Sequence, residues 1–269
     1  MRVISNRPIR EFCASRKADG EIAARDFATW RKIAEAAAWR NHGDLKQTFG
    51  SADRVGNCTV FDVGNNRFRL IGRVNFGTGM LYVLAVMDHK EYDRGKWIDA
   101  CGCNDPPPTK PESRRADQAG REPKSEEGAM IVGAPDHGLV GDSYFDLVRR
   151  FPLMGIRDDD HLDQAVEVIH NLLRQDRDDG EEAYLEALSI LVESYEKEHD
   201  PTPDASPAEV LRELMRSNGL SQTKLSRAVH IAQSTISAIL GGERSMTTSQ
   251  ITALAAYFKV KPAAFLPKP

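Results

Sequence analysis

The hydrophobic positions of this 269-residue chain change their spacing within the first hundred residues. Two stretches, near residues 9–16 and 22–38, repeat apolar residues at helical spacing after a short apolar pair at residues 3–4. From residue 59 to residue 87 apolar and polar residues alternate, and two turns rich in glycine and asparagine interrupt the alternation. The pattern predicts a short strand, two helices and a meander, which together make an α+β domain of helices packed on a small antiparallel sheet.

The second half of the chain shows only helical spacing. Helices are predicted near residues 144–149, 161–174 and 181–198. Two prolines then break the chain, and Ser206 precedes a further helix that has proline at its first position and glutamate three residues after the serine. The C-terminal region is therefore expected to be all α.

A stretch of unusual composition separates the two regions. It contains five prolines and many charges but almost no large apolar residue, which is typical of a linker. We expect four segments: a domain at residues 1–100, a linker at 101–130, a helical region at 131–204 and a second domain at 205–269.

The distribution of charge supports this division. The 36 basic and 40 acidic side chains give a formal net charge of only −4. Residues 1–99 nevertheless carry +5, residues 131–204 carry −13 and residues 205–269 carry +5. Two basic segments suggest two surfaces for polyanions, and the acidic segment between them suggests a mask for one of these surfaces.

Other features narrow the class of protein. The longest apolar run, residues 81–87, is far shorter than the ~20 residues needed to span a bilayer. No apolar segment follows the first arginines, so we expect a cytoplasmic protein without a secretory signal or a membrane contact. All four cysteines are then expected as reduced thiols. Cys101 and Cys103 lack the second ligand pair of a zinc site, so neither a metal nor a cofactor is expected.

Two short apolar-striped stretches near the C-terminus predict a helix-turn-helix. Residues 221–229 and 233–240 flank a three-residue turn, and they resemble the Cro/repressor (XRE-like) family together with their flanking helices over residues 207–266. His230 stands where that family usually has glycine, so we expect a positive φ there.

The resemblance implies binding to operator DNA. In that family the second helix reads bases in the major groove, and the end of the first helix holds phosphate. It implies DNA contacts by Gln222, Thr223, Lys224, Gln233, Ser234, Thr235, Ser237 and Arg244. A unit used only for dimerisation or docking is the alternative interpretation.

A row of basic side chains marks the strand predicted over residues 67–76. With a period of two, its apolar residues face the core, and the opposite face carries Arg67, Arg69, Arg73 and Asn75. His89, Lys90 and Tyr92 follow the next strand. Cleavage of RNA by attack of a ribose 2′-hydroxyl needs a base, an acid and cations, which these side chains can supply. A basic face that binds nucleic acid without chemistry is the alternative.

The same region resembles the HigB family of type II toxins. The resemblance covers residues 1–97 and is carried by KQTFGSADRVGNCTVFDVGNNRFRLIGRVNF and, after a turn, GMLYVLAVMDHKEYDRGKW. It implies a RelE-like fold and a metal-independent endoribonuclease that cuts mRNA on the ribosome. It implies catalytic roles for Arg69, Arg73, His89 and Tyr92 and RNA binding by Lys46. The strand pattern and the segment after it add Lys90 as a catalytic candidate and Arg67 and Asn75 as RNA-binding candidates.

The acidic region and the helix-turn-helix resemble a HigA-type antitoxin. The chain is therefore expected to be a toxin–antitoxin fusion whose C-terminal half neutralises the toxin and represses its own promoter as a homodimer. We expect Asp158, Asp159 and Asp160 to dock on the arginine face, within one chain or between two chains of a swapped dimer. The alternative is a helix-turn-helix regulator whose N-terminal domain binds RNA or a ligand without catalysis.

Overall fold

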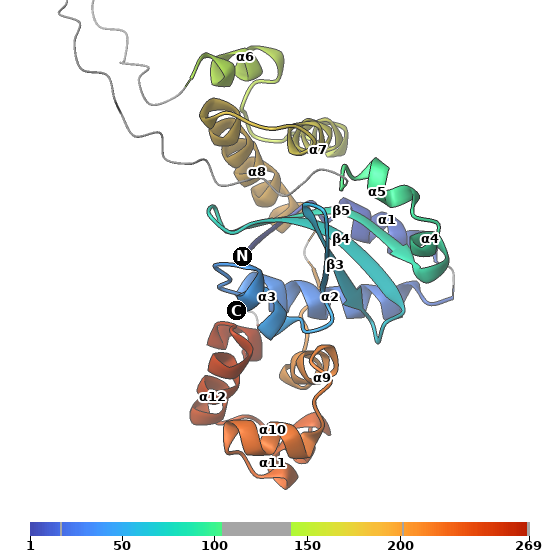
Figure 1. Cartoon of the computed structure of the whole chain (residues 1–269), viewed down its shortest axis with the longest axis vertical. Helices are drawn as coiled ribbons and strands as arrows, with labels where there is room; N and C mark the ends of the chain where they lie inside the picture. The colour runs from blue at the N-terminus through green and yellow to red at the C-terminus, as the bar shows by residue number, and fades with distance from the viewer. Residues whose placement is uncertain (17, 104–140, 201, 268–269) are drawn as a thin grey trace, which may run out of the picture.

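The alternating region of the N-terminal half forms a five-stranded sheet (Figure 1). The structure is a computed structural model that describes residues 1–16, 18–103, 141–200 and 202–267. The strands lie in the order β1-β5-β4-β3-β2. Their bounds are β1 (Arg2–Ile4), β2 (Asp53–Val55), β3 (Cys58–Val63), β4 (Phe68–Asn75) and β5 (Met80–Asp88). Strand β1 is parallel to β5 and the other pairs are antiparallel, so the predicted meander is confirmed within a mixed sheet.

Three helices lie between β1 and β2 in the sequence, and two short helices follow β5. They are α1 (Arg7–Ser15), α2 (Gly20–Ala36), α3 (His42–Thr48), α4 (His89–Asp93) and α5 (Lys96–Ala100). The apolar stripe of α2 is buried as predicted, and the Trp30 ring packs edge-on against Phe61 of β3 with centroids 5.3 Å apart. Helix α3 and strand β2 were not predicted, because seven and three residues are too short to show a period.

Strand β4 buries apolar side chains on both of its faces. Phe68 and Leu70 belong to the core beneath α1 and α2, whereas Ile71 packs on the other face with Cys58. A bulge lies between Ile71 and Gly72. A Cβ at Gly72 would lie 3.1 Å from the carbonyl oxygen of Tyr82, so glycine permits this close approach of the two strands.

The C-terminal half is all α, as predicted. Its elements are α6 (Asp142–Arg150), α7 (Asp159–Leu173), α8 (Asp179–His199), α9 (Pro207–Ser217), α10 (Gln222–Val229), α11 (Gln233–Leu240), α12 (Thr248–Phe258) and the 3₁₀ helix η2 (Pro262–Phe265). Ser206 and Glu209 form the predicted capping box of α9. Among the helices that the structure describes, none combines the length and apolar character needed to cross a membrane.

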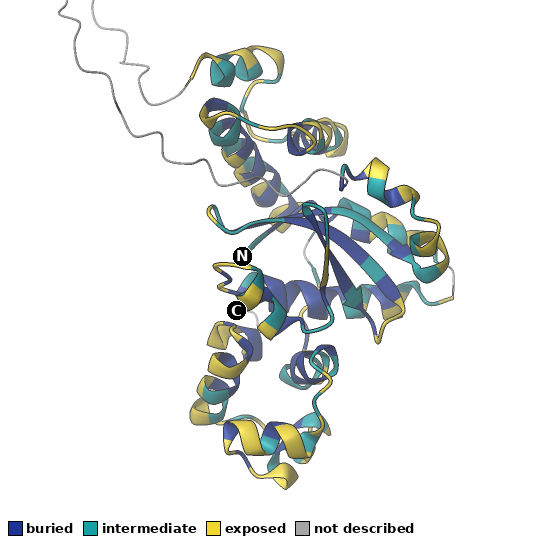
Figure 2. Cartoon of the chain, in the orientation of Figure 1, coloured by how far each residue is buried: buried dark blue, intermediate teal, exposed yellow. Residues whose placement is uncertain are grey.

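The N-terminal domain lies between two parts of the C-terminal half (Figure 1). On one side, Tyr184 and Leu188 of α8 share a core with Ile4 and Tyr82 of β1 and β5. On the other side, α9, α12 and η2 pack against α2 and α3 in one continuous core. A backbone bridge between Ala37 and Val260 joins the two halves there. The C-terminal half therefore contacts the N-terminal domain on both sides through buried apolar residues, and Figure 2 shows buried residues on the sheet, on α8 and on α9.

The cysteines correct one expectation. Cys58 of β3 and Cys103 form a disulfide with Cα atoms 5.4 Å apart, so the prediction of four reduced thiols is wrong. Cys13 and Cys101 are free. This bond ties residues 101–103, the first three residues of the predicted linker, to β3. Residues 104–130, which carry the remainder of the predicted linker, lie outside the described residues.

Candidate functional site

One end of the sheet brings together three of the predicted catalytic residues. Arg69 lies on β4, and His89 and Tyr92 belong to α4, which begins directly after β5. The Arg69 guanidinium lies 5.4 Å from the centroid of the Tyr92 ring. Nε2 of His89 contacts the carbonyl oxygen of Asn66, and Arg69 Nη1 is 3.5 Å from the same oxygen. Lys90 is exposed beside this group, which we call the β5-end cluster.

Asp62 of β3 also belongs to the β5-end cluster, although the sequence analysis did not select it. Its Oδ1 lies 2.8 Å from Arg69 Nη1, so the charge of the arginine is partly compensated. The residue faces Arg69 because the two are directly paired across β3 and β4. The alternation of each strand predicts which face each residue lies on, so this pairing could be predicted once the register of β3 and β4 is known.

The protonation of the cluster suits proton transfer. Burial raises the pKa of Tyr92, while Arg69 lowers it in part, so the phenol keeps its proton at neutral pH and can donate it. A carbonyl only accepts hydrogen bonds, so His89 Nε2 is the donor in this contact, and the tautomer that fits it has Nδ1 as its acceptor. An acceptor, a proton donor and a guanidinium therefore lie at one end of the sheet.

The other two arginines of the predicted face do not join this cluster. Arg67 lies in the turn before β4 and pairs with Asp26 of α2, so its predicted placement beside Arg69 is wrong. The strand begins at Phe68, after two asparagines with positive φ, and the period of two does not extend back to residue 67. Arg73 does lie on the expected face but is only 8% exposed. It donates to the carbonyl oxygen of Gly102 over 3.0 Å and to Asn57 Oδ1 over 2.9 Å, which holds the chain after α5.

The two remaining predicted RNA-binding residues lie apart. Asn75, at the far end of β4, donates to Glu182 Oε1 of α8 over 2.6 Å and is thus covered by the C-terminal half. Lys46 of α3 donates to the carbonyl oxygen of Ala52 over 2.6 Å and lies 3.8 Å from Asp53. Lys46 is therefore held at the start of β2 and not in the β5-end cluster.

The predicted mask at Asp158, Asp159 and Asp160 is not on the arginine face. Asp158 caps α7 by accepting from the amide of His161, and Asp159 accepts from the Tyr195 hydroxyl. All three are exposed, and the two bonds of Asp158 and Asp159 stay within the C-terminal half. An aspartate at a helix start is held by the helix's own amides, which the charge count alone does not reveal.

Other acidic residues make the contact with the N-terminal domain. They pair with a basic edge formed by β1 and the start of α1, and they were missed because single acids spaced along helices form no run in the sequence. The pairs are Arg2–Glu193 at 3.0 Å, Arg7–Asp163 at 2.7 Å and Arg10–Asp200 at 3.8 Å, with Lys32–Asp204 at 2.7 Å on α2. The acidic segment therefore docks on a basic surface, but on a different one from that predicted.

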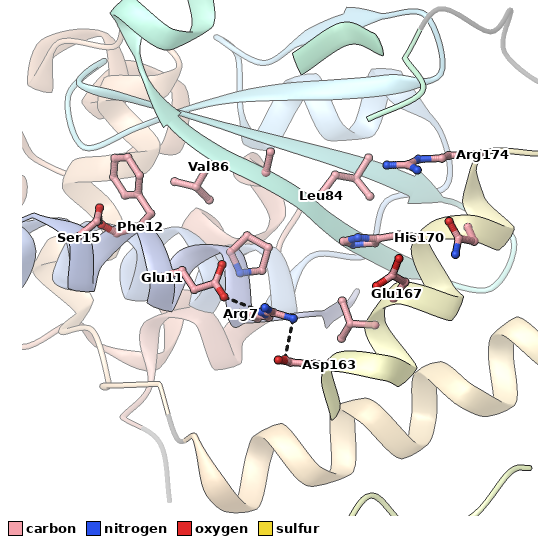
Figure 3. Close-up of a pocket in the computed structure, with 14 residues that line it drawn as sticks. Arg7, Glu11, Phe12, Ser15, Leu84, Val86, Asp163, Glu167, His170 and Arg174 are labelled. Carbon is pink, nitrogen blue, oxygen red and sulfur yellow. Dashed lines mark hydrogen bonds and ion pairs between the residues drawn. The ribbon is translucent and has the colours of Figure 1, made fainter. Parts of the chain in front are cut away.

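A cleft of about 520 Å³ marks the same junction (Figure 3). It lies between α1, β5 and α7, with Leu84 and Val86 on its strand side and Arg7, Asp163 and His170 on its helix side. Burial lowers the pKa of His170, and a hydrogen bond with the backbone of Val83 offsets part of this effect. The histidine is therefore neutral at pH 7 where α7 meets β5. No group of three histidine, cysteine or carboxylate side chains suited to a metal ion occurs among the described residues.

The helix-turn-helix presents its polar face away from the N-terminal domain. Helices α10 and α11 lie at the far end of the molecule, where Thr223, Lys224, Gln233, Ser234, Ser237 and Arg244 are exposed and Gln222 and Thr235 are half-buried (Figures 1 and 2). Gln233 donates to Gln222 Oε1 over 2.8 Å, which joins the starts of the two helices. His230 has a φ of 55°, so the predicted left-handed turn is confirmed.

Comparison with known families agrees with these two parts. Residues 23–95 match the model of a family described as HigB_toxin, the RelE-like toxic component of a toxin–antitoxin system. Residues 208–265 match the model of a helix-turn-helix domain. The first match contains the whole β5-end cluster, and the second contains both helices of the predicted DNA-reading motif. No curated protein matches the chain.

Proposed function

A RelE-like HigB toxin domain joined to a helix-turn-helix domain is the composition of a HigB–HigA-type fusion, and from it we propose that the chain is a self-inhibited mRNA endoribonuclease that also represses its own promoter. The β5-end cluster within the matched toxin segment is the observation that carries the proposal. The N-terminal domain cuts mRNA presented on the ribosome, residues 141–204 neutralise it, and residues 205–269 bind operator DNA as a homodimer.

The proposed reaction follows from the groups in the cluster. Nδ1 of His89 takes the proton of a ribose 2′-hydroxyl, whose oxygen attacks the neighbouring phosphorus. Arg69 stabilises the negative charge that develops on the phosphate oxygens, exchanging its contact with Asp62 for one with the phosphate. Tyr92 gives its proton to the 5′-oxygen as that bond breaks. The products are a 2′,3′-cyclic phosphate and a free 5′-hydroxyl, and no metal ion takes part.

Inhibition in this proposal does not require the cluster to be covered. The ion pairs with the C-terminal half lie on β1, α1 and α2, whereas Lys90 beside the cluster is exposed. The C-terminal half adds bulk on two sides of the toxin domain (Figure 1) and compensates its basic edge. Both effects keep the domain from a large, polyanionic substrate such as the ribosome with its mRNA.

Separate expression of the two halves tests the proposal. Residues 1–103, which include the disulfide, should arrest growth and deplete mRNA, and residues 141–269 supplied as a second chain should restore growth. A non-catalytic regulator, the alternative interpretation, predicts normal growth and intact mRNA in both cases. Growth arrest without mRNA loss would also contradict the proposal.

A further inference from the structure

One carboxylate of the C-terminal half lies at the start of helix α1. Glu196, near the end of α8, is only 2% exposed, and its Oε1 accepts from the amide of Asn6 over 2.6 Å. Asn6 is the N-cap of α1 but its own side chain makes no capping bond, so a residue 190 positions away satisfies the helix start. Burial raises the pKa of Glu196, and its hydrogen bond with the Asn6 amide and the charge of Arg31 lower it in part. The donors at the start of α1 favour the charged carboxylate, and burial opposes them.

The surroundings of this carboxylate contain donors that it does not use. Ser5 Oγ and Arg31 Nη1 are buried without a partner among the described residues, and their side chains belong to residues 2% and 4% exposed. The amide of Ser5 and the charge of Arg31 both lower the pKa of Glu196, and the Arg31 guanidinium lies against the carbonyl oxygen of Val3, two residues before Ser5. Glu196 Oε2 is itself buried without a partner. The Glu196 carboxylate therefore leaves buried hydrogen-bonding groups of this pocket without partners.

The other contacts of Arg31 fix its position in the pocket. Its Nη2 donates to the carbonyl oxygen of Val3 over 3.2 Å, and its Nε donates to Glu35 Oε1 over 2.8 Å. These bonds come from within the N-terminal domain, so the guanidinium does not depend on Glu196 for its placement. Its unused Nη1 remains a fixed donor when the C-terminal half leaves.

The rim of the pocket is basic as well. Arg2, Arg7 and Arg10 surround the start of α1 in the chain, and each pairs with an acid of the C-terminal half. Removal of that half leaves these charges around two free amides, a serine hydroxyl and a guanidinium. Such a set of donors suits a tetrahedral oxyanion, because phosphate offers more acceptor oxygens than a carboxylate and binds readily at helix starts.

We propose that Ser5, Asn6 and Arg31 form a phosphate-binding site of the toxin domain, which Glu196 fills in the full chain. Phosphate and the docked α8 then exclude each other. The source of the phosphate is an RNA backbone or free phosphate, and the RNA source rests on the proposed function. In the full chain Glu196 of α8 therefore occupies the place of the phosphate, while Glu193 pairs with Arg2 and Asp200, just after the helix, accepts from the Asn6 side chain.

Thermal unfolding of the full-length Glu196→Ala variant tests the site. In this variant α8 remains but the pocket is vacant. Inorganic phosphate, compared with chloride at equal ionic strength, should raise its midpoint by about 3–5 °C more than that of the native chain at about ten times the Kd. Glu198→Ala is the matched control, since it removes an exposed carboxylate two residues further along the same helix, outside the pocket. It should respond as the native chain does, and an equal response of the two variants would overturn the proposal.

Two further measurements complete the test. If Glu196→Ala does not fold in chloride, its soluble yield on refolding in phosphate replaces the midpoint, and equal yields in both salts contradict the site. A short RNA without terminal phosphates distinguishes the sources: stabilisation by this RNA and by phosphate assigns the RNA backbone, and stabilisation by phosphate alone assigns free phosphate. Neither readout involves cleavage, so a toxin domain without nuclease activity would refute the proposed function and leave this site intact.

Discussion

Thr48 Oγ1 donates a hydrogen bond to the carbonyl oxygen of Phe258 over 2.7 Å, across 210 positions of sequence. The same hydroxyl accepts from Trp39 Nε1 over 2.8 Å. Thr48 is completely buried where α3 meets α12, so one side chain satisfies polar groups of the toxin domain and of the helix-turn-helix domain at once. The two domains are thus held together by an apolar core and by a directional hydrogen bond that fixes their relative position.

Replacement of this hydroxyl should therefore destabilise the whole chain. Thr48→Val keeps the shape but leaves the Trp39 indole and the Phe258 carbonyl without partners, at a cost of about 2–4 kcal/mol in the free energy of unfolding. Urea unfolding measures the loss. Thr252→Val is the control, because the Thr252 hydroxyl is exposed and bonds only within α12. Its effect should stay below about 0.5 kcal/mol, and an equal loss in both variants would show that the inter-domain bond contributes nothing.

The fold was predictable where residues repeat with a period and not where contact depends on distant parts. Alternation and helical stripes gave the strands of the meander, α1, α2 and the helix-turn-helix, since each buries one face. The docking of α9 and α12 on α2 could not be predicted. Their apolar faces, and the buried Lys32, show that a partner exists but do not identify it.

The candidate site divides in the same way. Arg69, His89 and Tyr92 were selected because the meander brings consecutive strand ends together. Arg67 was misplaced because the start of β4 is set by the turn, not by the period. Asp163, Glu193 and Glu196 were missed because a count of charges finds runs, whereas docking uses single acids on two different helices, α7 and α8.

Removal of the proposed catalytic groups should abolish RNA cleavage without unfolding the toxin domain. His89→Ala and Arg69→Ala should each lower the cleavage rate of residues 1–103 by roughly 10²–10⁴, measured as mRNA decay in a translating extract. Arg94→Ala is the control, because Arg94 is exposed just after α4 and removes the same kind of charge. If all three variants cleave equally, the β5-end cluster is not the catalytic site.

Acids at the basic edge should matter for docking, and those at the start of α7 should not. Asp163→Ala and Glu193→Ala each break an ion pair with the toxin domain, so each should weaken binding between residues 1–103 and 141–269 by about 0.5–1 kcal/mol, or two- to fivefold in Kd. Titration calorimetry measures this. Asp160→Ala removes an exposed charge on the same helix as Asp163 and should leave the Kd unchanged. A loss as large as that of Asp163→Ala would restore the mask first predicted for that acidic run.

Acidification should loosen the junction at His170. Burial lowers the pKa of this histidine below its ordinary value of 6.5, so the folded chain favours the neutral ring. The resulting stability is present above pH 6.5 and is lost as the pH falls through the lowered pKa. Arg174 and Arg7 add to the lowering, and Glu167 opposes it. The free energy of unfolding should fall between pH 7 and pH 5 in the native chain and fall less in His170→Gln, which keeps a polar side chain in the cleft.

His42 provides an internal comparison for this pH dependence. Burial lowers its pKa too, but it lies at the start of α3, away from α7. His42→Gln should therefore retain the part of the pH dependence that His170→Gln removes. Identical profiles for His170→Gln and the native chain would show that His170 does not couple docking to pH.

DNA binding should persist in the fully docked chain, because the reading face of α10 and α11 points away from the toxin domain (Figure 1). On DNA from upstream of the chain's own gene, Gln233→Ala should cost about 1–3 kcal/mol of affinity, since it removes a side chain that can bond a base edge.

Lys224→Ala should instead weaken binding to all sequences and reduce the slope of log affinity against log salt by about 1. Lys197→Ala is the matched control, as it removes the same charge from an exposed position of α8. Fluorescence anisotropy at several salt concentrations separates the two effects. If Lys197→Ala lowers the slope as much as Lys224→Ala, the affinity for DNA depends on the net charge of the chain and not on the position of Lys224. Native affinity in Gln233→Ala would place base recognition elsewhere on the helix-turn-helix.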